Sequence, residues 1–256
     1  MKLKSTTFVA VILLSLGWRS ISVSQSQADT NLPRKIDSYG AIACDDAMAR
    51  LDYFANQLQN ESHSQGYIVV YPEKNGLPGK YLSYMNFAGE YLEATRGVAP
   101  GRLTTLRGGL RDNLTTELWI APVNAPPPVT ADTIEPEISP VARKFDEGFA
   151  DYSTYQGKRH LWTYDLCGLG AIYLKAYAEH LRSGSDAKGY IIIYTERGKR
   201  ARARTVARLL RDELVKGRKV PADRVVTIYG GRRAMPEAEL WIVPEGAAVP
   251  KPAPKS

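Results

Sequence analysis

The sequence contains few of the residues on which many catalytic and metal sites depend. Its 256 residues include two cysteines, Cys44 and Cys167, and three histidines, His63, His160 and His180. Neither the histidines nor the cysteines have the spacing of a zinc site. No glycine-rich phosphate loop follows an expected strand, and no nucleophile elbow occurs. We therefore expect no catalytic residues, no metal and no cofactor.

Long hydrophobic runs are also missing, except near the N-terminus. The apolar run 7–18 follows Lys2 and Lys4 and is short for a membrane span. The small-residue sequence Ser26-Gln27-Ala28 supplies a cleavage site. We expect residues 1–28 to be a secretory signal peptide, with an uncleaved membrane anchor as the alternative. The mature protein is then periplasmic or secreted, in a bacterial cell envelope, without a transmembrane segment.

Strong charge of one sign is absent once these residues are removed. The chain has a net charge of +7, and residues 1–28 contain three of the positive charges and no acidic residue, which leaves +4. Such a mild excess does not predict a nucleic acid partner.

The sequence does contain an internal repeat. The segment Gly66–Tyr71 recurs as Gly189–Tyr194, and Glu117–Pro122 recurs as Glu239–Pro244, at offsets of 123 and 122. A register kept over some eighty positions indicates an internal duplication. We place copy one at 29–123, a proline-rich linker at 124–143, copy two at 144–246 and a disordered Pro/Lys tail at 247–256.

Each copy is predicted to fold as β-α-β-α-β-β, a small mixed sheet with helices on one face, which is an α+β class. Residues 145–157 are expected to be an insertion before the first strand of copy two. In copy one the expected strands are 35–39, 66–71, 102–106 and 114–120, and the helices lie near 51–58 and 84–92. In copy two the expected strands are 159–164, 190–194, 225–228 and 238–243, and the helices are 169–181 and 201–214.

This element order, with two turns, resembles the OmpA-like C-terminal domain. The segments 98–102 and 220–224 resemble the Val-Pro-Ala-Asp-Arg turn of that family, and residues 202–210 match its Arg-Ala-x-x-Val-x-x-x-Leu helix pattern. The resemblance covers most of both copies at the level of pattern and implies binding to peptidoglycan. The last strands, Glu-Leu-Trp-Ile in both copies, depart from the Arg-rich last strand of the family, so the chain resembles a divergent branch.

The resemblance also implies ligand-binding residues. The family holds the diaminopimelate of the peptide stem with an acidic residue after the second strand and an arginine on the second helix. The nearest acidic matches are Glu73 in copy one and Glu196 in copy two. Arg202 and Arg204 are the matching arginines of copy two, whereas copy one has no arginine at this place.

The second helix of copy two is strongly basic, and this feature is independent of the family resemblance. Its apolar stripe of Val206, Leu209, Leu210 and Leu214 leaves much of the basic set facing water. The helix is either a solvated face or a site for an anionic partner, because arginine suits carboxylates and phosphates. The basic residues within this stretch are Arg197, Lys199, Arg200, Arg202, Arg204, Arg208 and Arg211.

The two cysteines fall on equivalent positions at the start of the first helix of each copy. In an oxidising compartment Cys44 and Cys167 are either a disulfide that joins the copies or two buried thiols.

Three functions follow as hypotheses. The first is a non-catalytic envelope protein that contacts peptidoglycan or another anionic envelope component through copy two. The second is a scaffold or assembly subunit that binds an envelope protein through its sheet edges, Trp119 and Trp241, without a cell-wall ligand. The third is a hydrolase whose catalytic residues lie far apart in the sequence.

Overall fold

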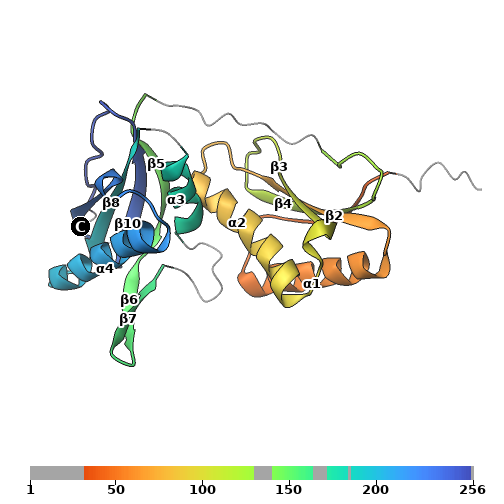
Figure 1. The fold of residues 1–256 in the computed structure, drawn as a ribbon, viewed down its shortest axis with the longest axis horizontal. Coiled ribbons are helices and arrows are strands. Elements are labelled where there is room, and N and C mark those ends of the chain that lie inside the picture. Colours follow the sequence, from red (N-terminus) through yellow and green to blue (C-terminus); the bar gives the residue numbers. More distant parts are fainter. Residues whose placement is uncertain (1–31, 130–139, 164–171, 184–185, 255–256) are drawn as a thin grey trace, which may run out of the picture. The chain divides into compact units, whose positions relative to one another are not determined.

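The structure, a computed structural model, describes residues 32–129, 140–163, 172–183 and 186–254. It has mixed α+β architecture, as the sequence predicts, in which helices lie between strands along the chain and the strands form small mixed sheets (Figure 1). Within these residues no helix is long and apolar enough to cross a membrane. The expected signal peptide, 1–28, lies outside the described residues.

Copy one forms a four-stranded sheet in the order β1-β4-β2-β3. The strands β2 and β3 are parallel, because a helix connects them, and β4 runs antiparallel to both of its neighbours. Its elements are β1 (Arg34–Tyr39), α1 (Cys44–Asn60), β2 (Ser64–Tyr71), α2 (Pro78–Glu90), a π-helical turn (Tyr91–Thr95), a 3₁₀ turn (Pro100–Arg102), β3 (Leu103–Arg107) and β4 (Thr115–Pro122).

Copy two repeats this order as β5-β10-β8-β9, again with one parallel pair, β8 with β9. Its second helix and the π-helical turn after it lie 122 residues beyond their counterparts in copy one. Its elements are β5 (Arg143–Phe149), the hairpin β6 (Asp151–Tyr155) and β7 (Lys158–Trp162), α3 (Leu174–Arg182), β8 (Lys188–Thr195), α4 (Arg200–Asp212), a π-helical turn (Glu213–Gly217), a 3₁₀ turn (Ala222–Arg224), β9 (Val225–Arg232) and β10 (Glu237–Val243).

The first strand of copy two is not where the sequence predicted it. The prediction of 159–164 is wrong, because β5 pairs with β10 and the later residues belong to the separate hairpin β6–β7. Lys35 faces Trp119 and Lys144 faces Trp241, so the first strands are offset by 144 − 35 = 109 residues. The insertion therefore follows the first strand. The error arose because the offset near 123, which holds after the insertion, was also applied to residues before it.

The two faces of each sheet have different coverings, as residue alternation along the strands requires. In copy one, Ile68 and Val70 of β2 share a core with the buried residues of α1 and α2. Tyr67, Val69 and Tyr71 point to the opposite face, where Ala125 and Val129 of the linker pack against them and their neighbours. We call this second surface the helix-free face.

Candidate functional site

The acidic residue and the first arginine predicted from the family resemblance each have a local partner in copy two, and their role in ligand binding stays a prediction. Glu196 pairs with Lys199 (2.7 Å). Arg202 is used locally, since its guanidinium donates to both carboxylate oxygens of Asp151 (2.6 and 2.9 Å) and to the Tyr152 carbonyl oxygen (2.7 Å). Arg202 thus ties α4 to the hairpin β6–β7. Among the described residues no ion pair joins Glu196 to Arg202.

In copy one the predicted acidic residue also has a local role. The Glu73 carboxylate lies 4.0 Å from the Lys80 ammonium group, and its backbone bridges to Arg111 beyond the end of β2. Glu73 therefore lies at the sheet edge beside a lysine, in a copy that lacks the helix arginine.

The cysteine prediction is only partly visible in the structure. Cys44 begins α1, is buried and is disulfide-bonded. Cys167 lies outside the described residues, so its pairing with Cys44 stays a prediction. Peptide mapping without reduction tests that pairing directly.

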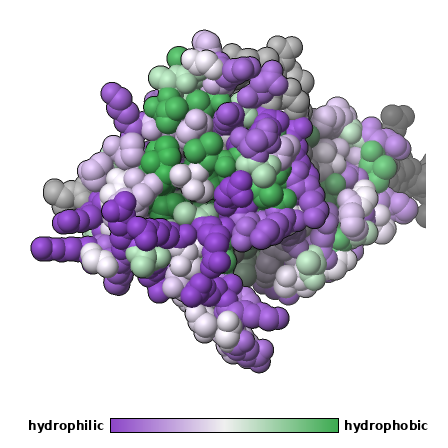
Figure 2. Space-filling model, turned by 60° about the vertical axis from the view of Figure 1, so that its left-hand side comes forward, coloured by the Kyte–Doolittle hydropathy of each residue, from purple (hydrophilic) through white to green (hydrophobic). Residues whose placement is uncertain are grey.

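Arg204 lies in a groove between α4 and the edge strand β9, which we call the arginine groove. The groove has a volume of about 350 Å³. The face of the molecule turned forward in Figure 2 shows hydrophobic residues bordered by hydrophilic ones. The residues that line the groove are Ile193, Ala203, Arg204, Ala207, Arg208, Arg211, Thr227, Ile228 and Tyr229.

The groove arises from small side chains on one face of α4. Because α2 and α4 are equivalent at an offset of 122, Ala203 and Ala207 stand where copy one has Tyr81 and Met85. The larger pair packs against the core of copy one and fills the space between helix and sheet. Methyl groups in the same positions leave that space open in copy two.

The rim of the groove carries positive charge available to a ligand. Arg204 and Arg208 are exposed and form no ion pair with the described residues. Arg211 donates to the Ala222 carbonyl oxygen (2.9 Å), and Arg200 lies over the ring of Tyr229 at 4.9 Å. The arrangement suits an anion with an apolar portion, since guanidinium groups bind carboxylate or phosphate while the floor is apolar.

A second arrangement, which the sequence did not predict, is a carboxylate cluster present in both copies. In copy one the buried Glu117 carboxylate accepts hydrogen bonds from Lys35 (2.6 Å), Arg111 (3.1 Å), the Trp119 indole (3.0 Å) and the Tyr71 hydroxyl (3.1 Å). The Arg111 guanidinium lies 3.3 Å from the centre of the Tyr71 ring. We call these five residues the copy-one cluster.

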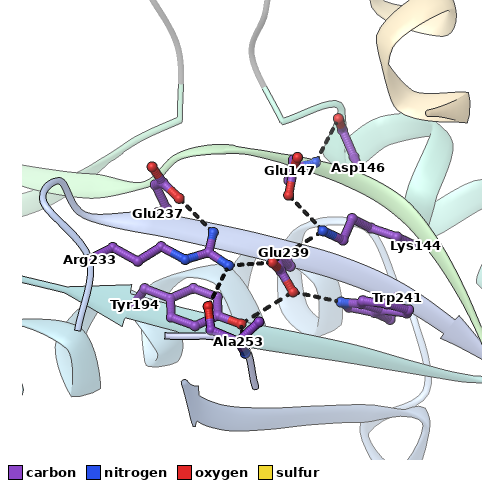
Figure 3. A network of polar contacts seen from close by, with 9 residues as sticks. All are labelled: Lys144, Asp146, Glu147, Tyr194, Arg233, Glu237, Glu239, Trp241 and Ala253. Atoms are coloured by element: carbon purple, nitrogen blue, oxygen red, sulfur yellow. Dashed lines mark hydrogen bonds and ion pairs between the residues drawn. The ribbon is translucent and has the colours of Figure 1, made fainter. Parts of the chain in front are cut away.

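The same cluster recurs in copy two (Figure 3). There the Glu239 carboxylate accepts from Lys144 (3.2 Å), Arg233 (2.5 Å), the Trp241 indole (3.0 Å) and the Tyr194 hydroxyl (3.3 Å). The guanidinium of Arg233 again covers the tyrosine ring, at 3.5 Å. These residues form the copy-two cluster.

The charge state of the central carboxylate follows from its partners. Burial raises the pKa of Glu239, but the hydrogen bonds from Arg233, Trp241 and Lys144 outweigh burial and hold that pKa below its ordinary value. The pKa of Glu117 is also lowered, since Lys35 and its other donors outweigh burial. Both carboxylates are therefore ionised anchors rather than proton donors.

A glycine in each copy makes room for the tyrosine of its cluster. A Cβ atom at Gly108 would lie 2.4 Å from the Tyr71 ring, and one at Gly230 would lie 2.5 Å from the Tyr194 ring. Gly230 lies within β9, where it permits the close approach of the ring.

The signal for these clusters was present in the sequence. A glutamate inside an otherwise apolar strand is unusual, and Glu117 and Glu239 repeat at the same offset as Arg111 and Arg233. The lysines were hidden, because the inserted hairpin shifts Lys144 to another offset. Trp119 and Trp241 are half-buried and their indole N–H groups are bonded within the clusters, so the scaffold hypothesis stays a prediction.

Comparison with known proteins adds no assignment. The chain matches no protein-family model and no curated protein. Among the described residues no group of three or more His, Cys, Asp or Glu side chains is placed to hold a metal ion.

Proposed function

We propose that the chain is an exported, non-catalytic binding protein of the bacterial cell envelope, whose copy two binds an anionic envelope component through the arginine groove. Peptidoglycan is the first ligand to test, because both copies resemble OmpA-like domains and the stem peptide carries carboxylates. Copy one would have a structural or protein-binding role.

The observation that carries this proposal is the difference between two equivalent helix faces. Ala203 and Ala207 open a groove where Tyr81 and Met85 close it, and the same face of α4 presents arginines where α2 has Leu82 and Asn86. A cavity and its charged rim thus occur together in one copy. A basic face that served only solubility would not require the space beneath it.

The groove supports recognition at two points. Arg204 and Arg208 lie one helical turn apart and can each donate two hydrogen bonds to a carboxylate or phosphate. Ile193 and Ile228 at the floor can accept a methyl or methylene portion of the same ligand. Because both arginines are exposed, their contribution depends on salt, whereas contacts with the floor do not.

The proposal is tested by co-sedimentation of residues 29–256 with purified peptidoglycan across a salt series. We expect pelleting that survives about 0.15 M salt and falls at least tenfold in the variant R204E/R208E, because two charge-assisted contacts become repulsive. The variant K74E/K158E is the matched control, since it makes the same change in net charge at exposed positions outside the groove.

Equal loss in both variants would show nonspecific attraction and contradict the groove as the site. No pelleting of the unmodified chain would contradict peptidoglycan as the ligand and direct the search to a protein partner of the envelope.

A further inference from the structure

The end of the chain occupies a built site on copy two. The Ala253 backbone N–H donates to the Tyr194 hydroxyl (3.0 Å), and Arg233 Nη2 donates to the Ala253 carbonyl oxygen (3.2 Å). Figure 3 shows this residue beside the cluster. Pro250 is buried, although the composition of residues 247–256 predicted a disordered tail. One residue is thus recognised through both of its backbone groups.

The groups that contact Ala253 are held in place by the rest of the cluster. The Arg233 side chain is 5% exposed and pairs with Glu237 (2.6 Å) and Glu239 (2.5 Å). The Tyr194 hydroxyl is fixed by the same Glu239 carboxylate. Preorganised donors and acceptors lose little freedom when a ligand arrives, which favours recognition of a peptide.

The sequence of the tail matches what the site can recognise. Pro250, Pro252 and Pro254 favour an extended polyproline II conformation, so little entropy is lost when the segment docks. Prolines have no backbone N–H, and the one N–H between Pro252 and Pro254 is the group that Tyr194 binds. A Pro-X-Pro segment therefore presents a single donor and acceptor pair at a defined place.

Charge is complementary as well. The copy-two cluster and its ion-pair partners combine Lys144 and Arg233 with three carboxylates, those of Glu147, Glu237 and Glu239. The net charge of this set is −1, and the tail that docks beside it is basic, with Lys251 between two of its prolines.

Copy one shows the same relation between sheet and segment. Ala125 and Val129, on either side of three consecutive prolines, pack against the helix-free face beside Tyr67 and Trp119. In both copies the proline-rich stretch that follows the last strand returns to its own sheet. The repeat indicates a property of the face rather than a single chance contact.

We propose that the Tyr194, Arg233 and Glu239 face of copy two is a binding site for extended, proline-containing peptides, and that residues 250–254 are its resident ligand. The site takes a Pro-X-Pro segment of a partner protein when the tail is displaced. It is separate from the arginine groove, so either assignment can fail without the other.

The test uses a full-length chain in which residues 249–254 are replaced by glycine and serine, which leaves the site vacant. A fluorescent peptide of residues 248–256 should bind this chain in an anisotropy titration. Its binding to the unmodified chain should be at least tenfold weaker, because the tethered tail competes at a high effective concentration. The same peptide with Ala253→Pro should bind several-fold to tenfold more weakly, since only the N–H bonded to Tyr194 is lost.

Binding of the two peptides with equal affinity, or no binding to the folded Gly/Ser chain, would overturn the proposal. Exchange of tails between two molecules would support it; this exchange would appear as a dimer of the unmodified chain that the peptide dissociates. Amide hydrogen exchange provides a second measurement in the unmodified chain. The Ala253 N–H should be protected, and exchange at the rate of a free peptide would also overturn the proposal.

Discussion

Both copies keep a buried glutamate with a tryptophan, a tyrosine, an arginine and a lysine around it, yet the surroundings of the two clusters differ. Glu147 and Glu237 of copy two stand where copy one has Ser38 and Thr115. The copy-one cluster therefore has one carboxylate for two cations, whereas copy two has three.

The two clusters also differ in burial, and the arginine of the copy-two cluster is the more buried. The Arg233 side chain is 5% exposed beneath the tail, and the Arg111 side chain is 38% exposed. Both copies thus keep the residues that join the strands, while the side chains around the arginine groove and beneath the tail differ from their counterparts in copy one. The copies serve as controls for each other in every experiment below.

The largest effect is expected from removing the central carboxylate of copy two. Glu239→Gln should lower the free energy of unfolding by about 4 kcal/mol, because it leaves the buried Arg233 without its main counter-charge. Glu117→Gln should cost only about 1–2 kcal/mol, since water can reach Lys35 and Arg111. Urea unfolding followed by tryptophan fluorescence measures both, and equal losses would show that burial does not distinguish the clusters.

A pH effect of about 2–3 kcal/mol is expected from one pair of equivalent aspartates. Asp37 and Asp146 both lie opposite the central leucine of the last strand. Asp37 is paired with Arg50 (2.8 Å). Asp146 accepts hydrogen bonds from the backbone N–H groups of Tyr173 (2.7 Å) and Glu147 (2.9 Å), and within the described parts of the chain it has no ion pair. Burial raises the pKa of Asp146 to about 6.

Because that pKa is higher in the folded state, the folded protein holds its proton more tightly than the unfolded chain does. The stability that Asp146 contributes is full below about pH 4 and is lost as the pH rises through about 6. The unfolding free energy measured from pH 4 to 7, minus that of Asp146→Asn, should show this decline. A difference that stays constant with pH would contradict the raised pKa.

The sequence was sufficient for the fold class and most elements because strand and helix patterns were repeated in register. It was insufficient for β5, because the inserted hairpin changes the offset between equivalent residues. Lys35 and Lys144 are equivalent, but they are not separated by the offset near 123 that relates the rest of the copies. It also failed to predict the role of Arg202, because the motif gives a residue type but not its partner. Asp151, which pairs with Arg202, comes from the insertion itself and has no counterpart in copy one.

A smaller effect, about tenfold in ligand affinity, is expected from making copy two resemble copy one. Ala207→Met should fill the arginine groove with the side chain that copy one has at this position, while Arg204 and Arg208 remain. Stability should change by less than about 1.5 kcal/mol, because the added atoms enter space that is already open. Co-sedimentation in the same salt series measures binding, and unchanged pelleting would show that the exposed arginines act without the groove.

The reciprocal change provides the control. Met85→Ala should open space in copy one and lower its stability by about 2 kcal/mol, yet create no equivalent of the arginine groove, because Leu82 and Asn86 stand where α4 has Arg204 and Arg208. The neighbouring Arg107 already lies over the Tyr81 ring at 5.3 Å.

The smallest effect is expected from adding the outer carboxylate to the copy-one cluster. Thr115→Glu places in copy one the residue that copy two has as Glu237, within reach of Arg111. Because Arg111 is 38% exposed, the new pair should stabilise copy one by only about 0.5 kcal/mol, and less at high salt. Glu237→Thr should cost more, about 1–2 kcal/mol, because Arg233 is 5% exposed and loses a 2.6 Å partner that water cannot easily replace. Urea unfolding at low and high salt separates the two cases. Equal and opposite changes would mean that exposure does not set the strength of these pairs.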